Sequence, residues 1–334
     1  MLVKKYITLS SFYFFYCAVL GAILPYFGVY LKDNHFSTAL IATTSAILLA
    51  SNIIAPNFWG WLSDKIGRRS RIIQWGNLCA CVFFCFVFFV ESPWALLAVV
   101  AAFSFCWQGL IAQFEVVTLE EIKDTSISYG RVRMWGSVGF VGAVSLFGIL
   151  FDQVSISYFP HVTLFLFISL WLSTLFLQDC VYTPQEKISN KLVDTLKQPR
   201  IILLLVAILL VNISHGIYYT FFSIYLENLG YSKSSIGMLW TTAVIAEIAM
   251  FLVINKIFKR LPLQWILLFS LLMAIVRWGS ISLFSDTLLV LIFSQTLHAF
   301  TFSAVHSIMM ERIQREFKIE HQGKALFHRK RIDL

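Results

Sequence analysis

Six side chains that can carry charge stand in or at the ends of long apolar stretches, where such groups are rare. They are Glu115, Arg133, His215, Glu247, Arg277 and His298. An acid and an arginine in such a place can pair while a site is empty and exchange partners when a charged solute arrives. A histidine can pass a proton or form a hydrogen bond to the solute. These residue types therefore predict solute binding and proton transfer without a covalent step.

The composition indicates that lipid surrounds the elements that position these groups. The chain has 334 residues, of which 58% are hydrophobic and 13% charged, and its mean hydropathy is +0.77. Soluble proteins average about 45–50% apolar and about 25% charged residues. So few charges cannot cover a water-exposed surface, so a soluble enzyme, a disordered chain and a nucleic-acid binder are disfavoured. The net charge of +8 suits contact with anionic lipid headgroups.

Because a membrane span needs about 20 apolar residues, the sequence predicts an all-α polytopic membrane protein with ten spans. The expected spans are 6–31, 39–61, 72–90, 94–114, 134–151, 158–178, 201–226, 235–255, 263–284 and 287–310. They suggest four regions: an N-terminal six-helix bundle at 1–178, a cytoplasmic linker at 179–200, a four-helix C-terminal bundle at 201–310 and a basic cytoplasmic tail at 311–334.

The distribution of basic residues gives the expected orientation. With the N-terminus in the cytoplasm, the inside segments before the tail hold sixteen Lys and Arg residues, whereas the outside loops hold only Lys32 and Lys233. Basic residues accumulate on the cytoplasmic side of membrane proteins. The sequence therefore predicts a cytoplasmic N-terminus.

An internal repeat appears when the chain is shifted by 195 residues. Tyr30-Leu31 then falls on Tyr225-Leu226, and spans one to four fall on spans seven to ten. Such a repeat predicts two bundles related by an axis along the membrane normal. Two further spans would be needed to complete the second bundle, so we expect ten of twelve helices and a truncated or frame-shifted form of a protein of roughly 380 residues.

Patterns typical of enzymes are missing from the sequence. There is no P-loop, no paired-cysteine spacing suited to a metal, and no supported Ser/His/Asp constellation. We therefore expect no enzymatic activity, no metal and no cofactor, with a proton gradient as the energy source.

The loop after the second span carries a recognisable signature. It reads GWLSDKIGRR, in which Gly60, Asp64, Gly67, Arg68 and Arg69 occupy the positions of a G-x-L-x-D-x-x-G-R-R/K pattern. This spacing, between spans two and three, resembles the signature of the major facilitator superfamily. The resemblance implies two helical bundles and transport by alternating access.

Further segments narrow the resemblance. FYFFYCAVLGAILPYFGVYL near the start and YGRVRMWGSVGF at 129–140 resemble the lactose permease group of proton symporters, and within it the 3-phenylpropionate permease-like members. In that group an acid and an arginine spaced like Glu115 and Arg133 bind the sugar. The tryptophan that stacks on the sugar is replaced here by Phe140, which favours an aromatic or otherwise apolar substrate.

The remaining site residues lie deep in the second half. His215, Glu247, Arg277 and His298 stand between eleven and fifteen residues into their spans, so a rise of 1.5 Å per residue puts them in the membrane interior. We expect Glu247 to pair with Arg277 or to face water, and Glu247 and His298 to carry the proton. The lactose permease group has an acid three residues after the histidine, where this chain has Thr301.

The resemblance implies proton-coupled symport of a small solute, with a phenylpropionate-like aromatic carboxylate as one candidate. It also implies a monomer in the bacterial inner membrane, whose partners are the solute, the proton and the lipid bilayer, with no nucleic acid. Two alternatives stay open: an oligosaccharide- or nucleoside-type proton symporter, and an inactive remnant of such a permease.

Overall fold

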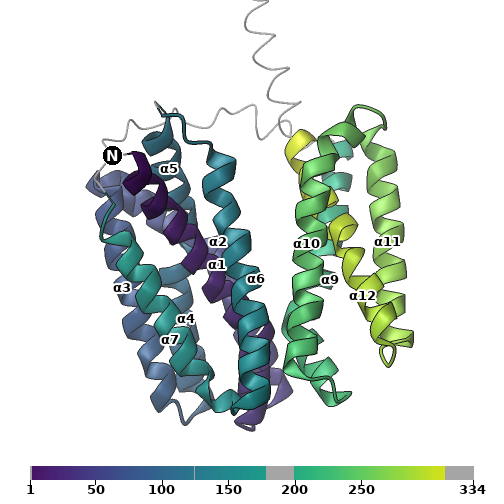
Figure 1. The fold of residues 1–334 in the computed structure, drawn as a ribbon, viewed down its shortest axis with the longest axis horizontal. Coiled ribbons are helices and arrows are strands. Elements are labelled where there is room, and N and C mark those ends of the chain that lie inside the picture. The colour runs from purple at the N-terminus through teal and green to yellow at the C-terminus, as the bar shows by residue number, and fades with distance from the viewer. Residues whose placement is uncertain (1, 124, 178–198, 313–334) are drawn as a thin grey trace, which may run out of the picture. The chain divides into compact units, whose positions relative to one another are not determined.

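The computed structural model describes residues 2–123, 125–177 and 199–312, and every regular element in these ranges is helical (Figure 1). Ten of the helices are long and apolar enough to cross a membrane. The predicted all-α polytopic architecture is therefore confirmed. The expected linker at 179–200, apart from its last two residues, and the expected tail beyond residue 312 lie outside the described residues.

The helices follow one another with short connections. Their bounds are α1 (Leu2–Asp33), α2 (Thr38–Ile66), α3 (Arg69–Cys85), η1 (Phe86–Phe89), α4 (Pro93–Gln108), α5 (Leu110–Ile122), α6 (Tyr129–Gln153), η2 (Ile156–Tyr158), α7 (Phe159–Thr174), α9 (Pro199–Asn228), α10 (Lys233–Phe258), α11 (Leu263–Leu283), α12 (Leu288–Thr296) and η3 (Ala299–Ala304). The fourth span continues through α5 to Ile122, beyond the predicted end at 114, and α6 begins at Tyr129 rather than 134. A span predicted from hydropathy ends at the first charged residues, whereas the hydrogen bonding of the helix continues past them.

The chain forms two compact units. One contains Met1–Gln185 with Tyr218–Met238, and the other contains Glu186–Ile217 with Leu239–Leu334. We call them the first and the second unit. The six-helix and four-helix division expected on either side of 179–200 stays a prediction.

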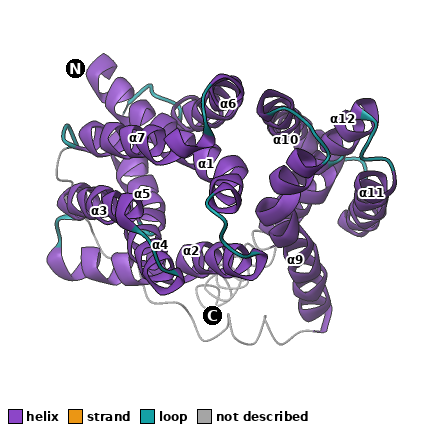
Figure 2. Cartoon of the chain, turned by 90° about the horizontal axis from the view of Figure 1, so that it is seen from below, coloured by secondary structure: helices purple, strands orange, loops and turns teal. Residues whose placement is uncertain are grey.

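Helix α1 is the central element of the first unit and packs against α6 and α7 (Figure 2). Sixteen of its 32 residues are buried, which matches its apolar sequence. Gly139 of α6 lies so close to α1 that a Cβ there would stand 2.1 Å from the carbonyl oxygen of Phe14. Gly136 is similarly close to Cys17, whereas a Cβ on Gly142 would meet no atom within 4 Å. Two of these three glycines of α6 therefore permit close packing of α6 against α1.

The helix bounds confirm the 195-residue repeat. Helices α1 and α9 end at Asp33 and Asn228, α2 and α10 begin at Thr38 and Lys233, and α4 and α12 begin at Pro93 and Leu288. Each pair of positions differs by 195.

The turn after α1 is also repeated after α9. His35 and Gly230 are equivalent positions, and both have a positive φ, of 61° and 85°. In each turn the next residue donates its backbone N–H to a carbonyl of the preceding helix at 3.1 Å, from Phe36 to Leu31 and from Tyr231 to Leu226. This is the helix-ending arrangement that a left-handed residue permits.

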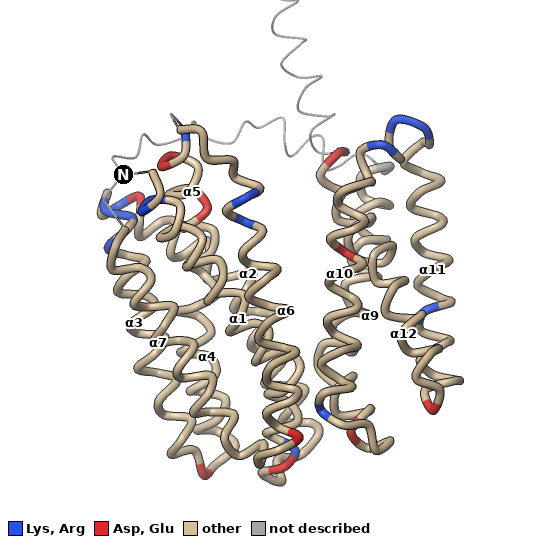
Figure 3. The backbone as a smooth tube through the Cα atoms, viewed as in Figure 1, with Lys and Arg blue, Asp and Glu red and all other residues tan. Residues whose placement is uncertain are grey.

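The signature loop forms a compact corner between α2 and α3. Gly67 ends α2 with a φ of 69° and donates its N–H to the carbonyl of Ser63. Arg69 at the start of α3 forms an ion pair with Asp64 at 2.6 Å between Nη2 and Oδ1. The arginine side chain is buried, so it holds the corner rather than reaching out to lipid phosphates. Lys and Arg residues gather at this end of the first unit (Figure 3).

Candidate functional site

A cluster of polar side chains, all buried except the partly buried Glu247, occupies the interior of the second unit. We call it the Arg277 cluster; it consists of Arg277, His215, His298, Glu247, Gln295 and Thr301. The side chains come from α9, α10, α11 and α12 with η3. Figure 3 shows an acidic segment of α10 and a basic segment of α11 away from the ends of these helices. Arg277 is completely buried, and His215 and His298 are 2% and 3% exposed. The structure thus brings together four of the six charged residues that the sequence singled out.

The guanidinium of Arg277 is the centre of the cluster. Its Nη1 lies 2.7 Å from Nδ1 of His298, 3.2 Å from Nε2 of His215 and 3.2 Å from Oγ1 of Thr301. Its Nη2 donates to Oε1 of Gln295 at 3.3 Å. A guanidinium in an apolar interior needs such acceptors, since arginine stays charged there.

His298 joins the arginine to Glu247. Its Nε2 lies 2.7 Å from Oε1 of the Glu247 carboxylate. Because Arg277 can only donate, Nδ1 of His298 must accept, so Nε2 carries the hydrogen and donates it to Glu247. The three side chains form a continuous chain from guanidinium through imidazole to carboxylate.

His215 is held in the opposite tautomer. Its Nδ1 lies 2.8 Å from the carbonyl oxygen of Val211, one turn earlier in α9, to which it donates. Its Nε2 is left to accept from Arg277. The backbone of α9 therefore presents His215 to the arginine as an acceptor.

The direct pairing of Glu247 with Arg277 that we expected is not formed among the described residues, because His298 lies between them. Sequence spacing gives the depth of each group in the membrane but not the side to which it points. A change in charge on Glu247 reaches Arg277 through the imidazole.

Two members of the cluster were not recognised as partners of the arginine from sequence. Gln295 stands one turn before His298, a spacing that puts both on one face of a helix and that could have indicated it. Thr301, noted only as a departure, contacts both Arg277 and His215 from the π-helical turn η3. Such π-helical turns occur frequently at functional sites.

Aromatic rings cover part of the cluster. The guanidinium carbon of Arg277 lies 4.5 Å from the ring centroid of Trp278, within range of a cation–π contact. The ring of Phe302 stacks on His298 with centroids 5.4 Å apart. These rings give the charged cluster an apolar border, and a low local dielectric strengthens electrostatic interactions.

In the first unit, Glu115 and Arg133 are not brought into an ion pair within the described residues. Arg133, half-buried on α6, lies 3.9 Å from the sulfur of Cys17 and 5.3 Å from the ring centroid of Tyr13. Glu115, half-buried on α5, accepts a hydrogen bond from the hydroxyl of Tyr129 at 3.3 Å. Both contacts are weak for charged groups.

Phe140 lies two turns beyond Arg133 on α6 and is half-buried beside α1. Trp107 is a core residue of the first unit: it is 1% exposed and packs on Tyr16 and Phe167. Among the described residues, no three His, Cys, Asp or Glu side chains are grouped so as to hold a metal ion.

Known proteins similar to this chain are transporters. A family model described as "MFS_1 like family" matches residues 6–328. The probable 3-phenylpropionic acid transporter of Escherichia coli (strain K12) is 28% identical over 90% of this chain and 80% of that protein. The maltose permease of Geobacillus stearothermophilus is 22% identical over 80% of this chain and 68% of that permease.

Solved structures share the fold. The nucleoside transporter NupG superposes with a TM-score of 0.82 and 17% sequence identity, over 93% of this chain and 82% of that one. A mutant of the same transporter gives a TM-score of 0.85 at 16% identity. Together with the ten membrane helices, the repeat and the signature loop, the family match identifies this chain as an integral, multi-pass membrane transporter of the major facilitator superfamily.

Proposed function

We propose that this protein is a proton-coupled symporter of a small solute and works by alternating access. The observation that supports this best is the chain Arg277–His298–Glu247, with heavy-atom separations of 2.7 Å at both links. It links a group that gains or loses a proton, Glu247, to a permanent cation through one imidazole. A proton arriving at Glu247 removes the negative charge that balances Arg277, and His298 transmits this change in charge to the arginine.

The proposed substrate class is a small aromatic monocarboxylate. Two observations favour it: the similarity to a protein described as a probable 3-phenylpropionic acid transporter, and the placement of arginines beside aromatic rings. Arg133 lies against Tyr13 and Arg277 against Trp278. A guanidinium can bind a carboxylate through two parallel hydrogen bonds.

The two arginines have different roles in this proposal. Arg277 is enclosed by its own acceptors, so it belongs to the proton-coupling group with Glu247, His298 and His215. Arg133 is half-buried and weakly partnered, so it is the anchor for the substrate carboxylate, with Glu115 and Phe140 beside it as secondary contacts. Interactions that strengthen only when the substrate is bound are what bias a conformational equilibrium.

The proposed setting is the bacterial inner membrane, with the N-terminus in the cytoplasm and the protein acting as a monomer. The excess of basic residues at the end of the first unit where α1 begins supports this orientation. The inward proton gradient supplies the energy, and no cofactor takes part.

Purified protein in liposomes tests the proposal. With an imposed inward proton gradient, we expect accumulation of labelled 3-phenylpropionate that a protonophore abolishes. Maltose, lactose and uridine serve as competitors, because relatives are described as maltose and lactose permeases and as a nucleoside transporter. Accumulation of one of these instead would correct the substrate class. Uptake that the protonophore does not reduce, or no uptake of any of the four solutes, would contradict the proposal.

A further inference from the structure

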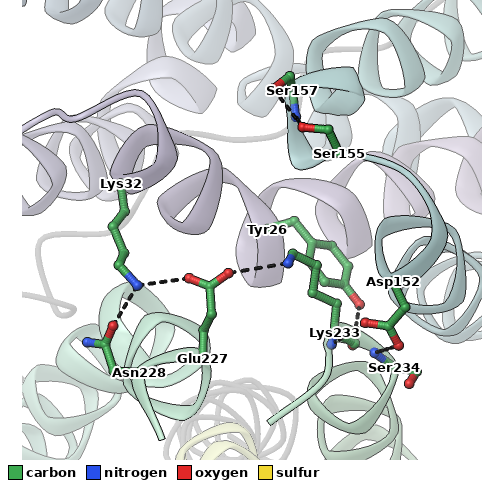
Figure 4. A network of polar contacts seen from close by, with 9 residues as sticks. All are labelled: Tyr26, Lys32, Asp152, Ser155, Ser157, Glu227, Asn228, Lys233 and Ser234. Carbon is green, nitrogen blue, oxygen red and sulfur yellow. Dashed lines mark hydrogen bonds and ion pairs between the residues drawn. The ribbon is translucent and has the colours of Figure 1, made fainter. Parts of the chain in front are cut away.

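The only two basic residues in the expected outside loops, Lys32 and Lys233, share one carboxylate, that of Glu227 (Figure 4). Lys32 Nζ lies 3.0 Å from Oε2 of Glu227, and Lys233 Nζ lies 3.4 Å from Oε1. Lys32 also donates to the side-chain oxygen of Asn228 at 2.5 Å. The last turn of α1, the last turn of α9 and the first residue of α10 are thus joined, and all three belong to the first unit.

Lys32 and Glu227 are related by the internal repeat. The two residues are 195 apart, the same separation as the internal repeat, so they occupy equivalent positions of the two halves of the sequence. The pair therefore joins corresponding ends of α1 and α9.

Asp152 of α6 makes a second tie to the same segment. Its two carboxylate oxygens accept the backbone N–H groups of Lys233 at 2.7 Å and Ser234 at 3.1 Å, the first two of α10 (Figure 4). The next two are satisfied within the turn, by the hydroxyl and carbonyl oxygens of Ser232. Half of the free N–H groups of this helix start are therefore capped by a different helix, with a negative charge at its positive end.

The backbones approach closely beneath these polar contacts. A Cβ on Gly148 of α6 would stand 2.7 Å from the carbonyl oxygen of Lys233, and one on Gly237 of α10 would stand 2.7 Å from that of Val144. The hydroxyl of the fully buried Tyr26 donates to Val144 at 2.8 Å and lies 3.4 Å from the carbonyl oxygen of Lys233. Side chains larger than hydrogen at the two glycines would hold α6 and α10 apart.

We propose that Lys32, Asp152, Glu227 and Lys233 form a latch that closes this end of the transporter and must open in each transport cycle. The inference rests on the alternating-access part of the proposed function, since a latch is needed only if the ends open in turn. Its members are suited to reversible closure, because the ion pairs are partly exposed, with side-chain exposures of 38%, 24% and 22% for Lys32, Glu227 and Lys233. Exposed pairs of this kind are individually weak.

The test is a labelling experiment that needs no substrate. Ile224 lies under the latch, opposite Gly28 of α1, so Ile224→Cys serves as a reporter for a membrane-impermeant maleimide, read by mass spectrometry of its peptide. Adding Glu227→Lys places three lysines together, and we expect labelling at least 10-fold faster than in the reporter alone, because like charges repel at this separation. Asp152→Asn keeps one acceptor and should raise the rate less.

A triple exchange makes the test specific to charge pairing. Lys32→Glu, Glu227→Lys and Lys233→Glu together restore both pairs with reversed sign, and labelling should return to within about 2-fold of the reporter alone. Lys5→Glu, which breaks the ion pair with Glu121 at the other end of α1, is the matched control and should leave labelling unchanged. Equal labelling in Glu227→Lys and the reporter, or no recovery in the exchange, would overturn the latch.

The outcome separates the latch from the transport proposal. If transport of the tested solutes fails, the labelling series still decides whether these charges close this end. If labelling does not respond while uptake of 3-phenylpropionate is normal, the latch is wrong and the symport proposal stands. Asp152→Asn, which adds no repulsive charge, keeps the series readable if Glu227→Lys does not fold.

Discussion

The two places where the sequence put an arginine near an acid have become different kinds of site. In the second unit, Arg277 is completely buried and hydrogen-bonded to two histidines, a threonine and a glutamine. In the first unit, Arg133 is half-buried and touches a thiol and a ring. Position along the helix accounts for the difference, because a charge far from the ends of an apolar helix needs acceptors within the protein, whereas one near the start of a helix, as Arg133 is in α6, can reach water.

This contrast suggests that the two arginines have different functions. An arginine whose two terminal nitrogens already have acceptors is poorly placed to receive a ligand, but it transmits a change in charge from one partner to the next. For a weakly partnered arginine, the free energy gained by binding an anion can exceed the free energy of the contacts that it gives up. The predictions that follow change one member of each region and compare the effects.

The largest effect should come from Arg277→Gln. Removing the central cation leaves His215 and His298 without their shared donor and Glu247 without the nearby positive charge, and breaking a buried ion network in this way costs about 3–5 kcal/mol. We expect loss of uptake together with a clear fall in Tm of the detergent-purified protein. Arg133→Gln is the matched change in the other region, and its Tm should stay close to that of the parent. Equal Tm values for both variants would contradict the claim that Arg277, unlike Arg133, is needed for stability.

Glu247→Gln should separate coupling from binding. The amide oxygen can still accept from His298, so the fold is retained, but the side chain can no longer take up and release a proton. We expect accumulation driven by a proton gradient to fall to background, while exchange of labelled for unlabelled substrate stays within about 3-fold of the parent. Parallel loss of accumulation and exchange would show a binding role for Glu247 instead. Glu247→Asp, which keeps an ionisable group, is the control.

Arg133→Gln should chiefly weaken substrate binding. A hydrogen bond to a charged group contributes about 1.5–3 kcal/mol, so we expect KM to rise about 10–150-fold with little change in the maximal rate. Arg133→Lys keeps the charge but loses the two-point geometry and should fall between. Initial uptake rates over a range of substrate concentrations measure this. A fall in the maximal rate with an unchanged KM would place Arg133 outside the binding site.

The amount that sequence could predict differs between the fold and the site. Apolar spans and the 195-residue shift predicted the ten helices and their repeat, because these depend on composition and period. Side-chain direction depends on how the helices are rotated, so the sequence did not show that His298 would stand between Glu247 and Arg277, nor that Arg133 would turn to Tyr13 rather than to Glu115. The π-helical turn that brings Thr301 to the cluster has no simple sequence signal.

Thr301→Val should have a smaller effect. It removes the hydroxyl between Arg277 and His215 without changing the charge, and one hydrogen bond contributes about 0.5–1.5 kcal/mol, or about 2–12-fold in uptake rate. Thr301→Ser, which retains the hydroxyl, should behave like the parent. A serine variant as impaired as the valine variant would assign the effect to the lost methyl group.

The smallest effect is expected from Glu115→Gln. The described polar contact of Glu115 is a single long hydrogen bond from Tyr129, which an amide oxygen can also accept. We expect uptake within about 3-fold of the parent and an unchanged KM. A loss as large as that in Arg133→Gln would mean that the two residues act as a pair during transport, although they are not paired in this structure.

The most direct test of the coupling role of Glu247 is the pH inside sealed liposomes when substrate is added without any imposed gradient. A trapped pH-sensitive dye reports proton movement that accompanies 3-phenylpropionate. The account predicts that the parent acidifies the lumen in step with substrate entry, and that Glu247→Gln transports substrate by exchange without moving protons. Acidification by Glu247→Gln at the rate of the parent, beyond the rate in protein-free liposomes, would contradict it.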